Sequence, residues 1–293
     1  MSRNQPWTIL SLLQWTTSHF DRNGIDSPRS AAEILLAYCL GLKRIDLYLQ
    51  HDRPLEKREL AAYKTLIKRR LRREPVAYIV GIKEFWSLPF QVNRNVLIPR
   101  PDSECLVESA LAVFSHRASD PPLAVLELGT GSGALVVSLA LEDPRHCYVA
   151  ADLSAGAVAL ARRNASRNQC RRIHFFAGDW LEALSDRRAF FDVILANPPY
   201  VKTGEMSRLQ PEITCEPRWA LDGGPDGLNS IRHLIHRAPA YLNPGGMLLL
   251  EIGYDQKSAV QELVEQQPAW ASVDFRRDYG GVARVAEIRR SEL

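Results

Sequence analysis

The sequence predicts an α/β fold in which a small helical bundle precedes a mostly parallel sheet covered by helices. Beyond Pro101, short apolar runs alternate with helical stretches, as in parallel strands joined by crossover helices. Before residue 77, apolar residues recur at three- and four-residue spacing, and no strand pattern interrupts them. We therefore expect a helical domain at 1–76, a β-hairpin linker at 77–104 and an α/β domain at 105–293.

Three amphipathic helices are expected in the first domain. The first covers Trp7–Phe20. The second begins with Ser27 as N-cap and Pro28 at the first helical position, and Gly41 fits its end. The third runs through Pro54–Glu74 and is closed by the proline that follows it.

Charge and composition favour a cytoplasmic protein. The formal net charge is only +3, which does not indicate nucleic-acid binding. The densest basic run, 68–73, is either the solvated face of a helix or a patch for an acidic partner, such as one associated with RNA. Five scattered cysteines without a Cys-x-x-Cys pair predict free thiols. The start is too polar for a signal peptide, and no stretch is apolar enough for a membrane span.

A hairpin is expected where the helical pattern stops. The extended segments 84–92 and 96–99 flank Asn93, Arg94 and Asn95, which is a typical hairpin signal. We expect this hairpin to link the two domains.

Seven strands are expected in the α/β domain. Five are apolar runs separated by helical stretches: Leu123–Gly129, Cys147–Asp152, Ile173–Asp179, Phe191–Asn197 and Gly246–Gly253. Such runs predict a parallel sheet covered on both faces. Two more, at 272–278 and 283–290, lie too close together for a helical crossover and predict an antiparallel pair at one edge.

A glycine-rich loop follows the first of these strands. It reads Glu-Leu-Gly-Thr-Gly-Ser-Gly and contains Glu127, Gly129, Thr130, Gly131 and Gly133. The glycines permit a tight turn and close approach of a ligand to the backbone. No lysine follows as in a phosphate-binding P-loop, and the glycine spacing is tighter than the dinucleotide fingerprint.

Further polar and aromatic residues end the next two strands. Asp152 lies 19 residues beyond Gly133, where a carboxylate meets a ribose diol in doubly wound sheets. Asp179 and Trp180 end the following strand and could contact an adenine amino group and ring. Each could be a loop residue or helix cap, but together they favour an adenosine site.

These residues resemble those of S-adenosylmethionine-dependent methyltransferases, which have a Rossmann-like fold. The resemblance implies that Glu127 and the glycine loop face the methionine part, and that Asp152 binds the ribose. Asp179 and Trp180 would line the adenine, and the product would be S-adenosylhomocysteine. Nearby acids favour a cationic sulfonium, whereas they would repel a pyrophosphate.

The sequence Asn197-Pro198-Pro199-Tyr200 ends the fourth strand at the same edge. Two acceptors, the Asn197 side-chain oxygen and the Pro198 carbonyl, could hold a planar NH2 group and favour the positive charge that develops during methyl transfer. The prolines stiffen this backbone, and Tyr200 offers a flat face. The tetrapeptide could also be a simple turn.

Three further segments resemble the HemK/PrmC family of protein-glutamine methyltransferases: 73–92, 97–104 and 216–228. The family typically has Glu-Thr-Glu where this chain has Asp102-Ser103-Glu104. The resemblance implies methylation of the glutamine side chain in the Gly-Gly-Gln motif of peptide chain release factors. It also implies that Arg100 helps to close the site, although Arg100 could instead pair with a local acid.

Several residues keep two interpretations. Phe85 and Trp86 could line the substrate approach or belong to the core between the domains. Glu251 follows the fifth strand and could touch the substrate or cap a helix. Asp222 and the two glycines after it suggest a turn, to which we assign no chemistry.

Three alternative functions remain open. The chain could methylate a glutamine of a large-subunit ribosomal protein or an amino group of a DNA or RNA base. The low net charge and the lack of a target-recognition domain weigh against the second. A non-enzymatic adenosine sensor would not need the acceptors at Asn197. We expect a monomer that acts on release factors and needs neither nucleic acid nor a membrane.

Overall fold

A computed structural model describes residues 6–116, 121–184 and 189–292, and the chain divides into two compact units. Unit 1 comprises residues 1–82 together with 210–215, and unit 2 comprises residues 83–209 and 216–293. Among the described residues, no helix has both the length and the apolar character needed to cross a membrane.

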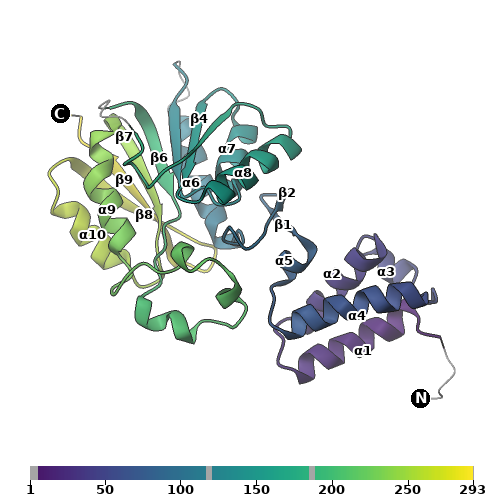
Figure 1. Cartoon of the computed structure of the whole chain (residues 1–293). Coiled ribbons are helices and arrows are strands. Elements are labelled where there is room, and N and C mark those ends of the chain that lie inside the picture. The colour runs from purple at the N-terminus through teal and green to yellow at the C-terminus, as the bar shows by residue number, and fades with distance from the viewer. Residues whose placement is uncertain (1–5, 117–120, 185–188, 293) are drawn as a thin grey trace. The chain divides into compact units, whose positions relative to one another are not determined.

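Unit 1 is helical, as the sequence predicts. Its helices, purple to blue in Figure 1, are α1 (Ile9–Arg22), α2 (Pro28–Leu40), α3 (Asp46–Leu49), α4 (Lys57–Leu71) and α5 (Val76–Val80). Their apolar faces share one core, in which Phe20, Leu35 and Tyr63 are fully buried. Burying these faces supplies most of the stability of such short helices.

The ends of α2 confirm most of the sequence prediction. Pro28 is the first helical residue, and Gly41 is the C-cap with a left-handed backbone (φ 66°). Ser27 lies at the N-cap position, but its backbone is itself left-handed (φ 48°) and its side chain makes no capping hydrogen bond. The predicted position of Ser27 is therefore confirmed, but the capping hydrogen bond expected from its side chain does not form, because such a bond needs an extended backbone at that position.

Three arginines of the basic run form ion pairs within unit 1: Arg69 pairs with Glu74, and the other two share one glutamate. Arg70, almost completely buried, lies 2.8 Å from Glu212, and Arg73 lies 3.5 Å from the same carboxylate. Glu212 belongs to the segment 210–215, which returns to this unit from much later in the sequence. The basic run thus stabilises a long-range contact, and this part of it is not a solvated face.

The hairpin lies earlier than the sequence predicts. Its strands are β1 (Ile82–Phe85) and β2 (Leu88–Gln91), which form a separate two-stranded sheet. The chain also turns at residues 93–96, where the Val96 N–H donates to the Asn93 carbonyl at 3.2 Å, but in the described structure this turn joins no paired strands, so the prediction of a hairpin there is wrong. Trp86 and Ser87 form the hairpin turn. Both turn residues have positive φ, 50° and 58°, as a two-residue hairpin turn of type I′ requires.

Tertiary contacts explain a turn without glycine or asparagine. The Trp86 backbone N–H donates to Glu104 Oε1 at 3.0 Å, and its indole Nε1 donates to Glu142 Oε1 at 2.7 Å. These bonds offset the cost of left-handed backbone at residues with side chains.

The main sheet of unit 2 has the predicted seven strands. They are β3 (Ala124–Leu128), β4 (Cys147–Asp152), β5 (Ile173–Ala177), β6 (Phe191–Ala196), β7 (Leu242–Glu251), β8 (Trp270–Arg277) and β9 (Ala283–Arg290). Their spatial order is β5-β4-β3-β6-β7-β9-β8. The first five are parallel, whereas β9 runs antiparallel to both β7 and β8. The parallel sheet and its antiparallel edge are confirmed.

Helices cover both faces of this sheet, as buried parallel strands require. They are α6 (Glu104–His116), α7 (Ala134–Glu142), α8 (Ala155–Arg167), α9 (Asn229–Arg237) and α10 (Lys257–Glu265). Residues of α6 and α7 share one core with alternate residues of the strands, and residues of α9 and α10 share the core of the other face.

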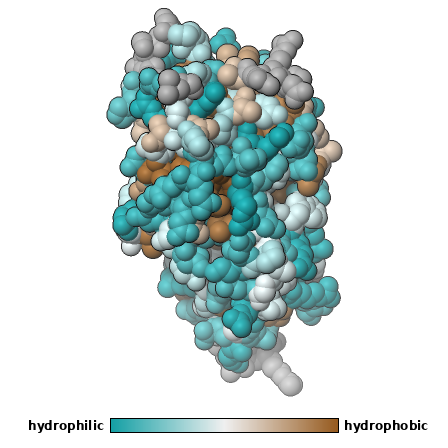
Figure 2. All heavy atoms as spheres, turned by 90° about the vertical axis from the view of Figure 1, so that its left-hand side faces the viewer, coloured by the Kyte–Doolittle hydropathy of each residue, from teal (hydrophilic) through white to brown (hydrophobic). Residues whose placement is uncertain are grey.

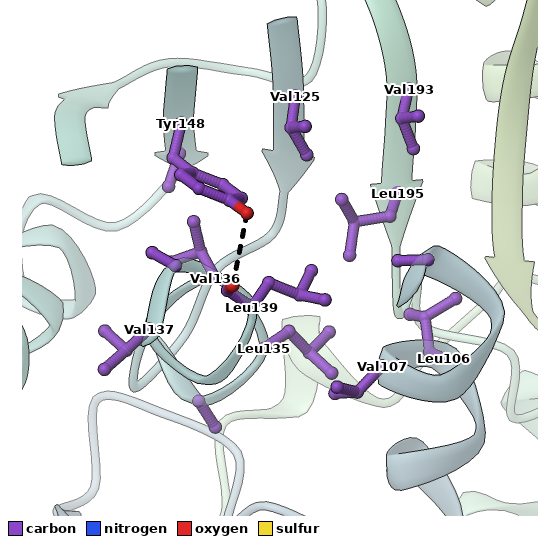
Figure 3. Packing of buried hydrophobic residues seen from close by; sticks show 14 of the residues in the cluster. Leu106, Val107, Val125, Leu135, Val136, Val137, Leu139, Tyr148, Val193 and Leu195 are labelled. Carbon is purple, nitrogen blue, oxygen red and sulfur yellow. Dashed lines mark hydrogen bonds between the residues drawn. The ribbon is translucent and has the colours of Figure 1, made fainter. Parts of the chain in front are cut away.

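Figure 3 shows how the first of these cores packs. Side chains of α6 and α7 lie below those of the strands, and Tyr148 of β4 donates its hydroxyl proton to the Leu139 carbonyl at 3.1 Å. A buried tyrosine thus keeps a hydrogen bond while its ring fills the core.

Short 3-10 helices complete the fold: η1 (Pro101–Ser103), η2 (Thr203–Arg208), η3 (Ile213–Cys215), η4 (Arg218–Ala220) and η5 (Ala238–Ala240). On the face drawn in Figure 2, hydrophilic side chains predominate, and hydrophobic residues show only as small patches between them.

Candidate active site

A cavity of about 300 Å³ lies in unit 2 at the carboxyl ends of the central strands. β3 occupies the middle of the parallel sheet, with β4 and β5 on one side and β6 and β7 on the other. The connections that follow β3 and β6 therefore run toward opposite edges of the sheet. This reversal creates the switch point at which open α/β sheets bind ligands.

Most of the predicted site residues meet in the wall of this cavity. Those that line it are Arg100, Glu127, Gly129, Thr130, Gly131, Asp152, Asp179, Trp180, Asn197 and Pro199. Gly133, Pro198 and Tyr200 lie next to these residues in the sequence but are not part of the lining.

The three loop glycines serve different purposes. All have positive φ: 73° at Gly129, 55° at Gly131 and 80° at Gly133. A methyl group on Gly131 would meet nothing within 4 Å, so this glycine provides the turn and leaves space beside the backbone. A methyl group on Gly133 would lie 3.1 Å from Ala161, so this glycine permits close packing of α7 on α8.

Glu127 supports the glycine loop from inside the protein. Its Oε2 accepts bonds from Thr130 Oγ1 at 2.6 Å and from the Val136 backbone N–H at 3.2 Å. Both bonds end on the same oxygen. Burial raises the pKa of Glu127 to about 8. A cationic ligand in the cavity would favour its charged form.

Asp152 ends β4 and holds the same loop. Its Oδ2 accepts from the Gly131 backbone N–H and its Oδ1 accepts from that of Ser154, both at 2.8 Å. Burial raises the pKa of Asp152. Each oxygen can accept a second bond, so the carboxylate retains capacity for the two hydroxyls of a ribose.

Asp179 and Trp180 follow β5 and complete this side of the cavity. Trp180 has a left-handed backbone (φ 44°), and its ring lies against Gly129, where an added methyl group would be 3.7 Å away. The ring therefore borders the glycine loop, as a stacking surface for a base would.

Asn197 lies on the opposite side of the cavity at the end of β6. Its Nδ2 donates to the hydroxyl oxygen of Ser103 at 3.0 Å. Ser103, the last residue of η1, is buried and also lines the cavity. This bond joins two segments 94 residues apart in the sequence.

Tyr200 is directed toward a buried acid. Its hydroxyl donates to Glu251 Oε1 at 3.4 Å, and Glu251, the last residue of β7, is only 1% exposed. Burial raises the pKa of Glu251 to about 7, although Ser103, Arg284 and Tyr200 act in the opposite direction. Neither interpretation made from the sequence, substrate contact or helix cap, describes this buried acid behind the motif.

The segment after Asp222 supports the backbone of the asparagine motif. A methyl group on Gly223 would lie 2.7 Å from the Pro199 carbonyl oxygen, and one on Gly227 would lie 2.4 Å from that of Tyr200. Gln256 Nε2 donates to the carbonyls of both Tyr200 and Gly227, at 3.2 and 3.0 Å. These glycines are therefore more than a turn, because they let two backbones touch.

Arg100 pairs with an acid that is distant in sequence. Its guanidinium donates to Glu216 Oε1, and Glu216 Oε2 accepts from the Ile98 backbone N–H at 3.0 Å. The pair thus fixes the cavity segment around Arg100 to the loop that begins at Glu216. Phe85 is 2% exposed in the core of unit 2 and also lines the cavity.

Sequence reasoning missed several residues of the wall and its support. Leu153 and Trp219 line the cavity although they are 62% and 57% exposed, so they are apolar side chains at its edge. Ser103 and Gln256 bind the asparagine motif from other segments, and Glu216 holds the segment around Arg100. Ser103 and Glu216 lie in segments that carried the family resemblance, but no single-residue pattern indicated their contacts.

The wall suits an adenosine ligand with a cationic group. It combines the buried Glu127, the half-buried Asp152, an aromatic ring and a glycine loop with space beside Gly131. Across the described part of the chain, no group of three or more histidine, cysteine, aspartate or glutamate side chains is arranged to hold a metal ion.

Comparisons with known proteins agree with this geometry. The family profile described as PrmC N-terminal domain matches residues 11–81, and the profile described as methyltransferase small domain matches residues 107–227. The chain is 46% identical over 280 residues to the release factor glutamine methyltransferase of Geobacter sulfurreducens, with 95% of each chain covered. It is 36% identical to the enzyme of the same name from Rhodopirellula baltica, with 99% of each covered.

Solved structures share the fold at low sequence identity. A methyltransferase from Pyrococcus furiosus aligns with a TM-score of 0.50 and 20% identity, over 77% of this chain and 98% of that one. Human methyltransferase 10 domain containing protein aligns with a TM-score of 0.51 and 14% identity, over 71% and 90% of the two chains. These similarities establish the Rossmann-like methyltransferase fold.

Proposed function

Because the chain belongs to the release factor glutamine methyltransferase family, we propose that it methylates the side-chain amide nitrogen of the glutamine in the Gly-Gly-Gln motif of peptide chain release factors. The observation that carries this proposal is the position of Asn197, which shares one cavity with the glycine loop and Asp152. An acceptor for an amino group thus lies beside the site for the methyl donor.

The donor of these enzymes is S-adenosylmethionine, whose sulfonium supplies an electrophilic methyl group. Residues 129–133 would give its methionine part access to backbone N–H groups. The Glu127 carboxylate would favour its positive charge, Asp152 would accept from its ribose hydroxyls, and Asp179 and Trp180 would contact its adenine. The geometry supports these roles because all four side chains line the cavity.

Asn197 and Pro198 would hold the target carboxamide. The amide nitrogen is a poor nucleophile because its lone pair is delocalised, so its position relative to the donor methyl is decisive. The Asn197 Oδ1 and the Pro198 carbonyl would each accept one of its two hydrogens, and would stabilise the positive charge that develops on the nitrogen. Pro199 stiffens this backbone and Tyr200 provides an apolar ring beside the carboxamide.

The helical N-terminal part, 1–76, would recognise the body of the release factor. Its match to the PrmC N-terminal domain supports this role. We expect the protein to work as a monomer in the cytoplasm and to need neither nucleic acid nor a membrane surface. Its net charge of +3 gives no strong electrostatic attraction to phosphates.

Transfer of labelled methyl groups to a purified release factor tests the proposed function. Label should enter the release factor and should disappear when the glutamine of its Gly-Gly-Gln motif is replaced. Large-subunit ribosomal proteins and DNA serve as parallel substrates. Labelling of either one, without labelling of the release factor, would contradict the proposal.

The variant Asn197→Ala tests the motif itself. We expect a loss of turnover of about a hundredfold or more, because the variant removes a hydrogen-bond acceptor that acts in the transition state. Cofactor affinity, measured by calorimetry, should change little. Near-normal turnover would exclude Asn197 from the mechanism.

A further inference from the structure

The direction of the Asn197 amide decides whether it can accept a substrate NH2 group. The two ends of the side chain are chemically opposite, because Oδ1 only accepts hydrogen bonds and Nδ2 only donates them. They are nearly equal in shape, so packing alone distinguishes them poorly. Rotation of the Asn197 amide by half a turn would direct Nδ2, a donor, at the substrate NH2 group, which is also a donor. A group outside the cavity must therefore fix the orientation.

Ser103 holds the donor end of this amide. Asn197 Nδ2 lies 3.0 Å from Ser103 Oγ, and Ser103 is 4% exposed. A serine hydroxyl can both donate and accept, so Ser103 alone would tolerate either orientation of the asparagine. The direction must come from what receives the single proton of the serine.

Glu251 is placed to receive that proton. It is almost completely buried at the end of β7, its Oε2 has no hydrogen-bond partner among the described residues, and the nearby Ser103 side chain lowers the pKa of its carboxyl group. A carboxylate can only accept, so a hydrogen bond from Ser103 to this free oxygen would use the hydroxyl proton of the serine. Ser103 Oγ can then only accept from Asn197, which turns Nδ2 toward the serine and leaves Oδ1 for the cavity.

We propose that Ser103 and Glu251 are positioning residues that fix the direction of the Asn197 amide, so that its oxygen faces the target nitrogen. This inference rests on the proposed function, since it assumes that Asn197 accepts from the target carboxamide. Neither residue needs to touch the reacting atoms. Both act by removing the unproductive rotamer.

The charge of Glu251 controls this arrangement. A protonated Glu251 becomes a donor, which allows Ser103 to give its own proton to Asn197 Oδ1 and reverses the amide. The groups that face Glu251 come from four elements: Tyr200 after β6, Arg284 on β9, Asp102 on η1 and Cys105 on α6. Burial brings the pKa of Glu251 to about 7, so turnover should rise as the pH increases through about 7.

Four variants test the proposal: Ser103→Ala, Ser103→Thr, Glu251→Gln and Ser109→Ala. The last is the matched control, because Ser109 is a buried serine on the neighbouring helix α6 and its Oγ has no hydrogen-bond partner among the described residues. Turnover is measured at saturating S-adenosylmethionine as a function of pH. Cofactor affinity is measured by calorimetry and folding by thermal unfolding.

Ser103→Ala should lower kcat by about tenfold, equivalent to about 1.4 kcal/mol, at unchanged cofactor affinity. Ser103→Thr restores the hydroxyl and should restore kcat, while Ser109→Ala should match the native protein. Glu251→Gln should lower kcat and abolish the rise through about pH 7, because a glutamine can donate at every pH.

Two results would overturn the proposal: native kcat in Ser103→Ala, or a native pH profile in Glu251→Gln. If Ser103→Ala fails to fold, Ser103→Thr and Glu251→Gln still decide the question. Failure of the proposed function looks different. In that case the native protein does not label the release factor, or Asn197→Ala retains turnover, whereas failure of the inference alone leaves Asn197→Ala inactive and the Ser103 and Glu251 variants active.

Discussion

Gly227→Ala should impair methyl transfer although Gly227 is not among the residues that line the cavity. Gly227 has φ 78°, and an added methyl group would lie 2.4 Å from the Tyr200 carbonyl oxygen and 2.9 Å from Gln256 Nε2. The carbonyl is backbone, so it cannot swing aside as a flexible side chain can. Either the asparagine motif or residue 227 must move.

The geometry sets the size of the effect. Real methyl contacts are essentially never shorter than 3.0 Å, so the two backbones must separate by at least 0.6 Å. A displacement approaching 1 Å at a positioned reacting group can lower the rate by about a hundredfold. We therefore expect kcat to fall by about tenfold to a hundredfold. The left-handed backbone adds a stability cost of about 1 kcal/mol.

Gly41→Ala is the matched control for this prediction. Gly41 also has a left-handed backbone (φ 66°), but a methyl group there would meet nothing within 4 Å. It should therefore show only the stability cost, as a lowered melting temperature with native kcat. Labelled methyl transfer and thermal unfolding of both variants separate the two effects. Equal kcat in Gly227→Ala and Gly41→Ala would refute the reasoning.

Two further predictions concern buried acids. Burial raises the pKa of Glu127 to about 8, so S-adenosylmethionine should bind more tightly as the pH rises through about 8 and the acid becomes charged. Glu127→Gln should remove this dependence in calorimetry, and an unchanged dependence would contradict the assignment. Glu212→Gln should destabilise the protein by about 3 kcal/mol in denaturant unfolding, because it leaves the guanidinium of Arg70 buried without its charged partner. Glu292→Gln, which breaks an exposed pair with Arg289, should have almost no effect, and equal effects would exclude a stabilising role for the Arg70 pair.

The strands of the parallel sheet were predictable because a strand that is buried on both faces needs apolar residues at successive positions. A strand such as β6 reads as a continuous apolar run, and the short interval between β8 and β9 excluded a helical crossover. Three helices of unit 1, α1, α2 and α4, were equally predictable, since an amphipathic pattern with proline and glycine at its ends needs no tertiary information. The short helices α3 and α5 were not predicted, because they have too few residues to show a helical period.

The hairpin was misplaced because tertiary contacts overrode local preference. Asn93, Arg94 and Asn95 form the better turn by propensity, whereas Trp86 and Ser87 are poor residues for positive φ. Bonds from Trp86 to two glutamates of later helices determine the observed turn. Such contacts depend on residues that no local window contains.

The candidate site shows the same division. Asn197, Asp152 and the glycine loop were found because each follows a recognisable strand, and the ends of parallel strands meet at one edge. The couplings of Asn197 to Ser103 and of Arg100 to Glu216 span 94 and 116 residues, and they depend on how irregular loops fold back. Their residue types are ordinary, so only the three-dimensional structure reveals their partners.

The most direct measurement is a crystal structure of the protein with S-adenosylhomocysteine and a peptide that contains Gly-Gly-Gln. We predict that the glutamine side-chain nitrogen will lie at hydrogen-bond distance, about 3 Å, from both Asn197 Oδ1 and the Pro198 carbonyl, with the product sulfur beside it. A peptide bound with its glutamine outside this cavity, or an Asn197 that presents Nδ2 to it, would contradict the account.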